Sequence, residues 1–167
     1  KQQLQWLKES LLSSDKNLNF RFIAVGNQVL NPVNNFECYR QFENEWQELM
    51  DFIVQHRIPG VVFLSGDRHM TEINFFQPGK EFYTLYDVTS SPLTSRSFST
   101  ITEHPEYNNP ARVDSTLLTE QNFLKATITG SFLANDRTLT FTAIDATGKV
   151  RWAKSFHENE LKMPNGE

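Results

Sequence analysis

An aspartate and a histidine separated by one residue, Asp67 and His69, are the side chains in this chain best suited to chemistry. They follow an apolar, β-branched run, 60–65, that breaks at Gly66. Such a run is typical of a strand buried on both faces, and open α/β sheets bind their ligands where such strands end. A carboxylate oxygen and an imidazole nitrogen suit Zn, Fe or Mn. The pattern predicts a metal-binding or catalytic role. The plainer alternative is a turn capped by Asp67, with Arg68 paired to a nearby acid and His69 half-buried.

Three other residues are candidates for substrate binding. Arg68 lies between the aspartate and the histidine, and its guanidinium could hold a phosphate through paired hydrogen bonds, although an arginine there more often points outward. Asn27 and Gln28 follow Gly26 at the end of another apolar run. They could orient a substrate or ligate a metal, or they could be ordinary turn residues.

The first third of the sequence predicts the elements that would position these residues. Leucines at helical spacing predict a helix over 4–13, and a nearly apolar run predicts a strand over 20–25. The clearest helical period runs from Phe42 to Val54 and stops before Pro59. Because the order is then strand, helix, strand, we expect a parallel βαβ unit with a right-handed crossover.

After His69 the pattern changes to antiparallel strands. Strand-like runs at 70–76 and 82–88 are joined by a turn that contains Pro and Gly. The following stretch, 89–121, is rich in Ser, Thr and Pro and has no sustained period. A segment of that length inside a domain is usually a functional loop or lid.

The last part of the chain predicts further hairpins and a tail. Apolar and polar residues alternate from 124 onward, and a turn at 145–148 precedes the last strand. We therefore expect one α/β domain over 1–157, with a βαβ start followed by antiparallel hairpins, and a polar tail over 158–167.

Composition limits the class of protein. The 167 residues suffice for one sizeable core, and 13% aromatic residues argue against disorder. The net charge is −4 with mixed signs and no basic block, so we expect no nucleic-acid surface. Cys38 is the only cysteine, which excludes an intrachain disulfide. No run approaches the roughly eighteen apolar residues of a transmembrane helix.

The sequence resembles the PhoD-like alkaline phosphatases and phosphodiesterases of the calcineurin-like metallophosphoesterase superfamily. The resemblance runs in order over most of the chain, and its most specific part is Ser65-Gly66-Asp67-Arg68-His69. Its other parts are Gln5-Trp6-Leu7 with Leu11-Leu12 and Ser14, Gly26-Asn27-Gln28, Trp46, Val88-Thr89-Ser90-Ser91, Asn122-Phe123 and Asp145 with Gly148.

The resemblance implies a four-layer α/β/β/α sandwich and an exported, periplasmic or secreted hydrolase of phosphoesters. It also implies a binuclear site of divalent or trivalent ions (Fe, Zn, Mn or Ca). Asp67 and His69 match the family's late metal-site motif, whereas Asn27 and Gln28 stand where many members place a metal-binding histidine.

The family's early motifs, Asp-x-His, Gly-Asp-x-x-Asp and Gly-Asn-His-Asp, do not appear in that form. We therefore expect the C-terminal half of a longer enzyme, which shares its metal site with the N-terminal half and is inactive alone.

Two other interpretations remain open. A non-catalytic, β-rich module that binds a ligand or partner would account for the aromatic residues and the late hairpins. A degenerate fragment that only packs against a partner would expose a large apolar face. For the half-sandwich we likewise expect exposed apolar surface, and hence self-association of the isolated chain.

Overall fold

Two sheets and two α-helices form the architecture within residues 2–15, 17–33 and 36–164, which the computed structural model describes. The helices are α1 (Gln2–Ser13) and α2 (Glu43–Gln55). The strands are β1 (Arg21–Ala24), β2 (Val61–Ser65), β3 (Thr71–Phe76), β4 (Leu85–Ser90), β5 (Asn122–Thr129), β6 (Thr138–Asp145) and β7 (Val150–His157). Short 3-10 helices are η1 (Tyr39–Gln41), η2 (Ser99–Glu103), η3 (Pro105–Asn108) and η4 (Glu158–Leu161).

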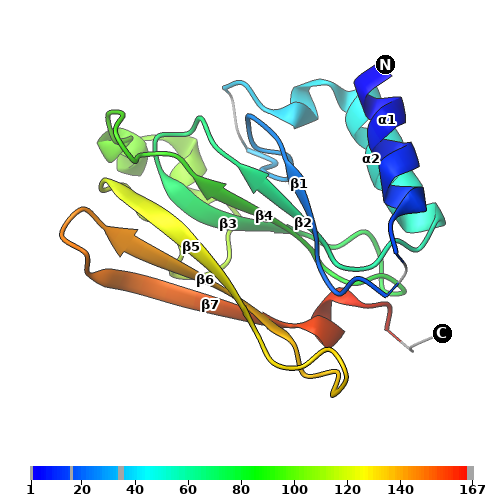
Figure 1. Cartoon of the computed structure of the whole chain (residues 1–167). Coiled ribbons are helices and arrows are strands. Elements are labelled where there is room, and N and C mark those ends of the chain that lie inside the picture. The colour runs from blue at the N-terminus through cyan, green and yellow to red at the C-terminus, as the bar shows by residue number, and fades with distance from the viewer. Residues whose placement is uncertain (1, 16, 34–35, 165–167) are drawn as a thin grey trace.

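The first sheet has the order β1-β2-β4-β3. β1, β2 and β4 run parallel, and β3 pairs antiparallel with β4. Helix α2 connects β1 to β2, so the predicted parallel βαβ unit is confirmed. Figure 1 shows α1 and α2 on one face of this sheet and the antiparallel β5-β6-β7 sheet on the other. The described residues thus form an α/β/β stack, and they place no α-helix on the outer face of the second sheet.

The core lies where the helices meet the first sheet. The periodic apolar positions of α2, including Trp46, Leu49 and Ile53, are buried as predicted. The Trp46 indole N–H also donates to the Val29 carbonyl, 2.8 Å away, which fixes the helix to the loop after β1. β2 is buried on both faces, because helices cover one side and the second sheet covers the other.

The second sheet joins this core through aromatic contacts. The Phe156 ring of β7 lies 4.4 Å, centroid to centroid, from the Tyr86 ring of β4. Residues 158–164 continue into η4 and bury Leu161, so this part of the predicted tail packs on the domain. Residues 165–167 lie outside the described residues.

The segment after β4, expected to be a functional loop or lid, has regular contacts along its length. After η2 and η3 it runs beside the outer edge of β3. There the Thr71 N–H donates to the Leu118 carbonyl and the Phe75 N–H donates to the Ala111 carbonyl, each at 2.8 Å. The segment therefore covers the β3 edge of the sheet, which would otherwise offer unpaired backbone groups.

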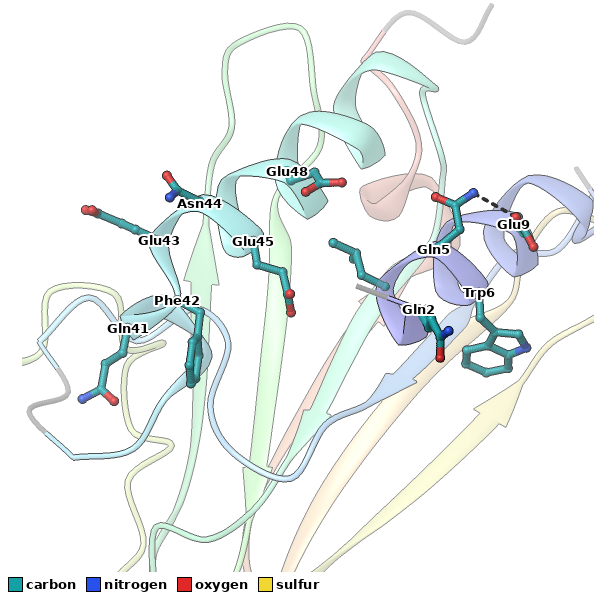
Figure 2. Close-up of a pocket in the computed structure, with 11 residues that line it drawn as sticks. Gln2, Gln5, Trp6, Glu9, Gln41, Phe42, Glu43, Asn44, Glu45 and Glu48 are labelled. Atoms are coloured by element: carbon teal, nitrogen blue, oxygen red, sulfur yellow. Dashed lines mark hydrogen bonds between the residues drawn. The ribbon is translucent and has the colours of Figure 1, made fainter.

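At the opposite edge of the first sheet, no strand of the described residues pairs with the outer side of β1, and apolar side chains are exposed there. Phe22 and Ala24 are exposed on it, and Trp6 and Phe42 beside it are 65% and 63% exposed. Cavities of about 500 Å³ and 1040 Å³ lie along α1, and the larger one extends to the start of α2 (Figure 2). The expected uncovered apolar surface is therefore present at this edge. No helix in the described part of the chain is both long and apolar enough to cross a membrane.

This edge leads us to expect that the isolated chain self-associates, because exposed strand edges and apolar side chains pair with copies of themselves. Light scattering over a concentration series should show a rising mean mass. The double substitution Trp6→Gln and Phe22→Thr should shift the distribution toward monomer. Leu133→Gln, at a 90% exposed position in the β5–β6 turn, is the matched control and should not. A monomeric wild-type chain at high concentration would contradict the prediction.

Candidate functional site

The three parallel strands β1, β2 and β4 have their carboxyl ends side by side, at the same end of the first sheet. The backbone at Gly66 is the point of contact: a methyl group added there would lie 3.6 Å from the Gly26 carbonyl oxygen and 3.9 Å from that of Ser90. The structure therefore brings together the strand-end residues that the sequence singles out, as expected for an open α/β sheet.

The turn after β2 projects two side chains outward and one inward. Asp67 and His69 are exposed, and their backbones have φ angles of +65° and +53°. Arg68 between them is buried. A pocket of about 540 Å³ lies at this turn, and its walls are Phe36, Glu37, Asp67, Arg68, His69, Arg96, Ser97 and Phe98. The predicted carboxylate and imidazole thus line one pocket.

The ligand atoms that Asp67 and His69 offer suit a metal ion, but two ligands are too few for a complete metal site. Within the described residues, no hydrogen bond engages the Asp67 carboxylate or the His69 imidazole, so both have free ligand atoms. Carboxylate oxygen and imidazole nitrogen fit Zn, Fe or Mn. The described part of the chain contains no group of three or more His, Cys, Asp or Glu that could hold a metal ion.

Arg68 is held by protein groups. Its Nη2 lies 2.5 Å from a carboxylate oxygen of Glu106, and both side chains are at least 95% buried. Its guanidinium also lies over the Phe36 ring, 4.8 Å from the centroid. Its Nε is buried without a hydrogen-bond partner among the described residues. The substrate-binding role predicted for Arg68 stays a prediction.

The two strand-end amides differ in their surroundings. Asn27 is half-buried beside Gly26 at the site edge. Gln28 is fully buried, and its Nε2 donates to Glu72 at 2.7 Å and to Thr89 at 2.9 Å. Their roles in substrate binding likewise stay predictions.

Several residues of the site were not singled out from the sequence. Phe36 lies in the loop after β1, and Arg96, Phe98 and Glu106 lie in the irregular segment after β4. No short spacing relates them to Asp67. The only signal was the length of that segment, which is typical of functional loops.

A buried carboxylate, Asp87 of β4, ties the loop after β1 to the sheet. One of its oxygens accepts hydrogen bonds from the Val29 and Leu30 N–H groups at 2.7 and 3.0 Å, and the other accepts from the Ser65 hydroxyl at 2.6 Å. Burial raises the pKa of Asp87 to about 6, although these hydrogen bonds favour the ionised form.

The raised pKa of Asp87 predicts a pH-dependent stability. A group with a higher pKa in the folded state stabilises the fold when protonated, so this contribution is complete below pH 3.8 and is lost as pH rises through about 6. Urea unfolding should show that lowering the pH from about 7.5 to about 5 stabilises the wild type by roughly 1 kcal/mol relative to Asp87→Asn. Equal pH dependence in the two proteins would contradict the assignment.

Comparisons with known proteins give a likeness of fold. No protein-family model and no curated protein matches the sequence. A solved structure described as "Structure of PhoD" superposes with a TM-score of 0.72 at 14% sequence identity, over 98% of this chain and 34% of that one. The chain thus spans about a third of that protein's length. The predicted α/β fold class is confirmed: the chain has a mixed α/β fold with two sheets, similar to that of PhoD.

Proposed function

We propose that this chain is part of a metal-dependent phosphoesterase of the PhoD-like kind, acting on phosphomonoesters or phosphodiesters, and that it supplies Asp67 and His69 to the metal site. The observation that carries this proposal is a carboxylate and an imidazole that line one pocket at the carboxyl end of a buried parallel strand and that form no hydrogen bond with the described residues. The likeness of fold to PhoD supports it.

Asp67 and His69 would hold the metal through an oxygen and a nitrogen. Bound there, a divalent or trivalent ion (Fe, Zn, Mn or Ca) supplies the Lewis acidity that phosphoester hydrolysis uses. Two ligands do not complete a site, and a binuclear one needs several more. We propose that the N-terminal half of the same enzyme provides the others and that the chain is inactive alone.

The phosphoester would bind at the same edge of the sheet. Asn27 and Gln28 are the candidates next to the turn, and Arg68 would contribute through a guanidinium that Glu106 already orients. We add Arg96, an exposed guanidinium in the wall of the pocket, as a group that could hold a phosphate oxygen. Export to the periplasm or cell exterior is part of the proposal.

The rival proposal is a non-catalytic, β-rich binding module. It is favoured if aromatic side chains form a platform in place of a cleft at Asp67. The pocket of about 540 Å³ at Asp67 and His69 favours the enzymatic proposal instead.

Asp67→Ala and His69→Ala in the complete protein test the proposal. Each should lower the amount of bound metal, measured by elemental analysis. Each should also lower the rate of hydrolysis of a chromogenic phosphoester by about a thousandfold, which corresponds to several kcal/mol of activation free energy. Asp51→Ala and His56→Ala, exposed positions in and just after α2, are the matched controls and should change neither. Unchanged metal content and activity in the two site variants would refute the proposal.

A further inference from the structure

The backbone of the turn after β2 needs support from outside itself. Asp67 and His69 have left-handed φ angles of +65° and +53°, which residues with a side chain adopt at an energetic cost. Such conformations persist where the surrounding structure fixes them. Both side chains point toward solvent, so neither provides that support. The support must come from Arg68 and from the backbone.

Several groups hold the Arg68 side chain. It is 5% exposed, its Nη2 is paired with the Glu106 carboxylate at 2.5 Å, and its guanidinium lies over the Phe36 and Phe98 rings, 4.8 and 5.9 Å from their centroids. The backbone N–H of Arg68 donates to the Ser91 hydroxyl at 3.0 Å.

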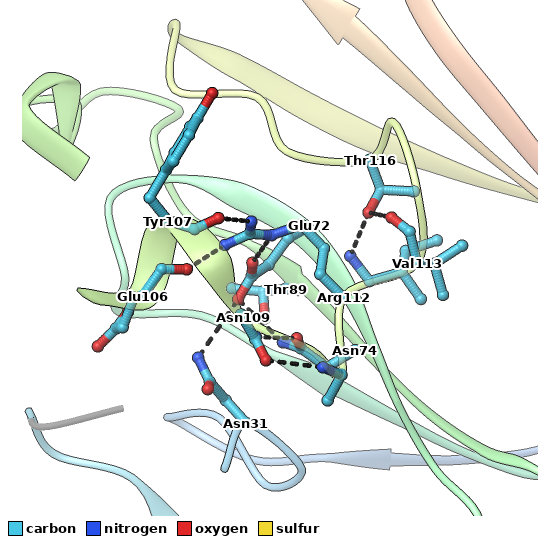
Figure 3. Close-up of polar contacts among 12 residues, drawn as sticks. Asn31, Glu72, Asn74, Thr89, Glu106, Tyr107, Asn109, Arg112, Val113 and Thr116 are labelled. Carbon is cyan, nitrogen blue, oxygen red and sulfur yellow. Dashed lines mark hydrogen bonds and ion pairs between the residues drawn. The ribbon is translucent and has the colours of Figure 1, made fainter. Parts of the chain in front are cut away.

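Glu106 is itself held by a second arginine. Arg112 donates from Nη2 to the Glu106 carbonyl at 2.7 Å and from Nη1 to the Tyr107 carbonyl at 2.6 Å (Figure 3). Its Nε pairs with the fully buried carboxylate of Glu72 on β3 at 2.6 Å. Arg112 thus anchors the η3 backbone, including that of Glu106, to the sheet.

These four residues form a continuous path, which we name the ionic chain: Glu72, Arg112, Glu106 and Arg68. Two ion pairs, Glu72 with Arg112 and Glu106 with Arg68, form its ends, and the hydrogen bond from Arg112 to the Glu106 main-chain carbonyl joins them. The two carboxylates and the two guanidiniums balance in charge inside the protein. The ionic chain begins on β3 and ends between the two residues that line the pocket.

We propose that Glu106 and Arg112 are positioning residues, which act through Arg68 to hold Asp67 and His69 in the geometry that binds metal. This inference rests on the proposed function. Residues that orient metal ligands from behind typically change metal affinity by about 10- to 100-fold when they are replaced.

The test is a titration of the metal-free complete enzyme with Zn²⁺ or Mn²⁺, with thermal unfolding measured on the same samples. Glu106→Gln should weaken metal binding about 10- to 100-fold. Glu158→Gln is the matched control, because Glu158 is also a fully buried carboxylate but bonds Arg137 and Lys162 beside η4, away from the turn. It should lower the thermal midpoint and leave metal affinity unchanged.

The double variant Arg68→Met with Glu106→Gln separates positioning from stability. It removes both buried charges, so the thermal midpoint should recover relative to Glu106→Gln. Metal affinity should stay low, because the pair between Arg68 and Glu106 then no longer holds the turn. If Glu106→Gln does not fold, Arg112→Lys takes its place. This variant keeps the positive charge beside Glu72 but loses the paired hydrogen bonds to the Glu106 and Tyr107 carbonyls.

Wild-type metal affinity in Glu106→Gln, or an affinity that recovers with stability in the double variant, would overturn the positioning role while the proposed function stands. If Asp67→Ala and His69→Ala leave the metal titration unchanged, the proposed function fails, and the positioning role falls with it.

Discussion

The buried ion pair between Arg68 and Glu106 joins two of the three parts of the chain that build the pocket. One is the turn after β2, and the other is the segment between β4 and β5; the loop after β1 is the third. A buried charge is stable only when it is paired, so each part constrains the conformation of the other. The pair is extended by Arg112 to Glu72 on β3, which connects the pocket wall to the sheet itself (Figure 3).

The parallel strands explain why polar groups gather at this edge. β1, β2 and β4 end together, and behind their ends lie the buried polar side chains of Gln28, Asp87 and Thr89. Each is hydrogen-bonded, as burial requires. The result is a buried polar cluster at this end of the sheet, and Asp87 within it fixes the loop after β1 through the Val29 and Leu30 N–H groups.

The two edges of the first sheet differ in a way that fits a larger assembly. The chain covers the β3 edge with its own residues 111–118, whereas the β1 edge, with Phe22 and Trp6 beside it, is left open. The proposed metal ligands, Asp67 and His69, are likewise only two, and the described residues contain no group of three or more His, Cys, Asp or Glu that could hold a metal ion. A likeness that spans 34% of PhoD agrees with both observations.

The sequence by itself determined the helices and strands, and it located Asp67 and His69 in the wall of the pocket. Apolar periods placed α1, α2 and the strands to within a few residues, because each period reflects burial of one face. The Gly break after a buried strand located Asp67 and His69, because strand ends in parallel sheets meet at one edge. Only the tertiary structure decided which residues surround them. The two ion pairs join residues 38 apart (Arg68 and Glu106) and 40 apart (Glu72 and Arg112) in the chain. Such pairs depend on how the irregular segment folds back onto β3, which no local pattern encodes.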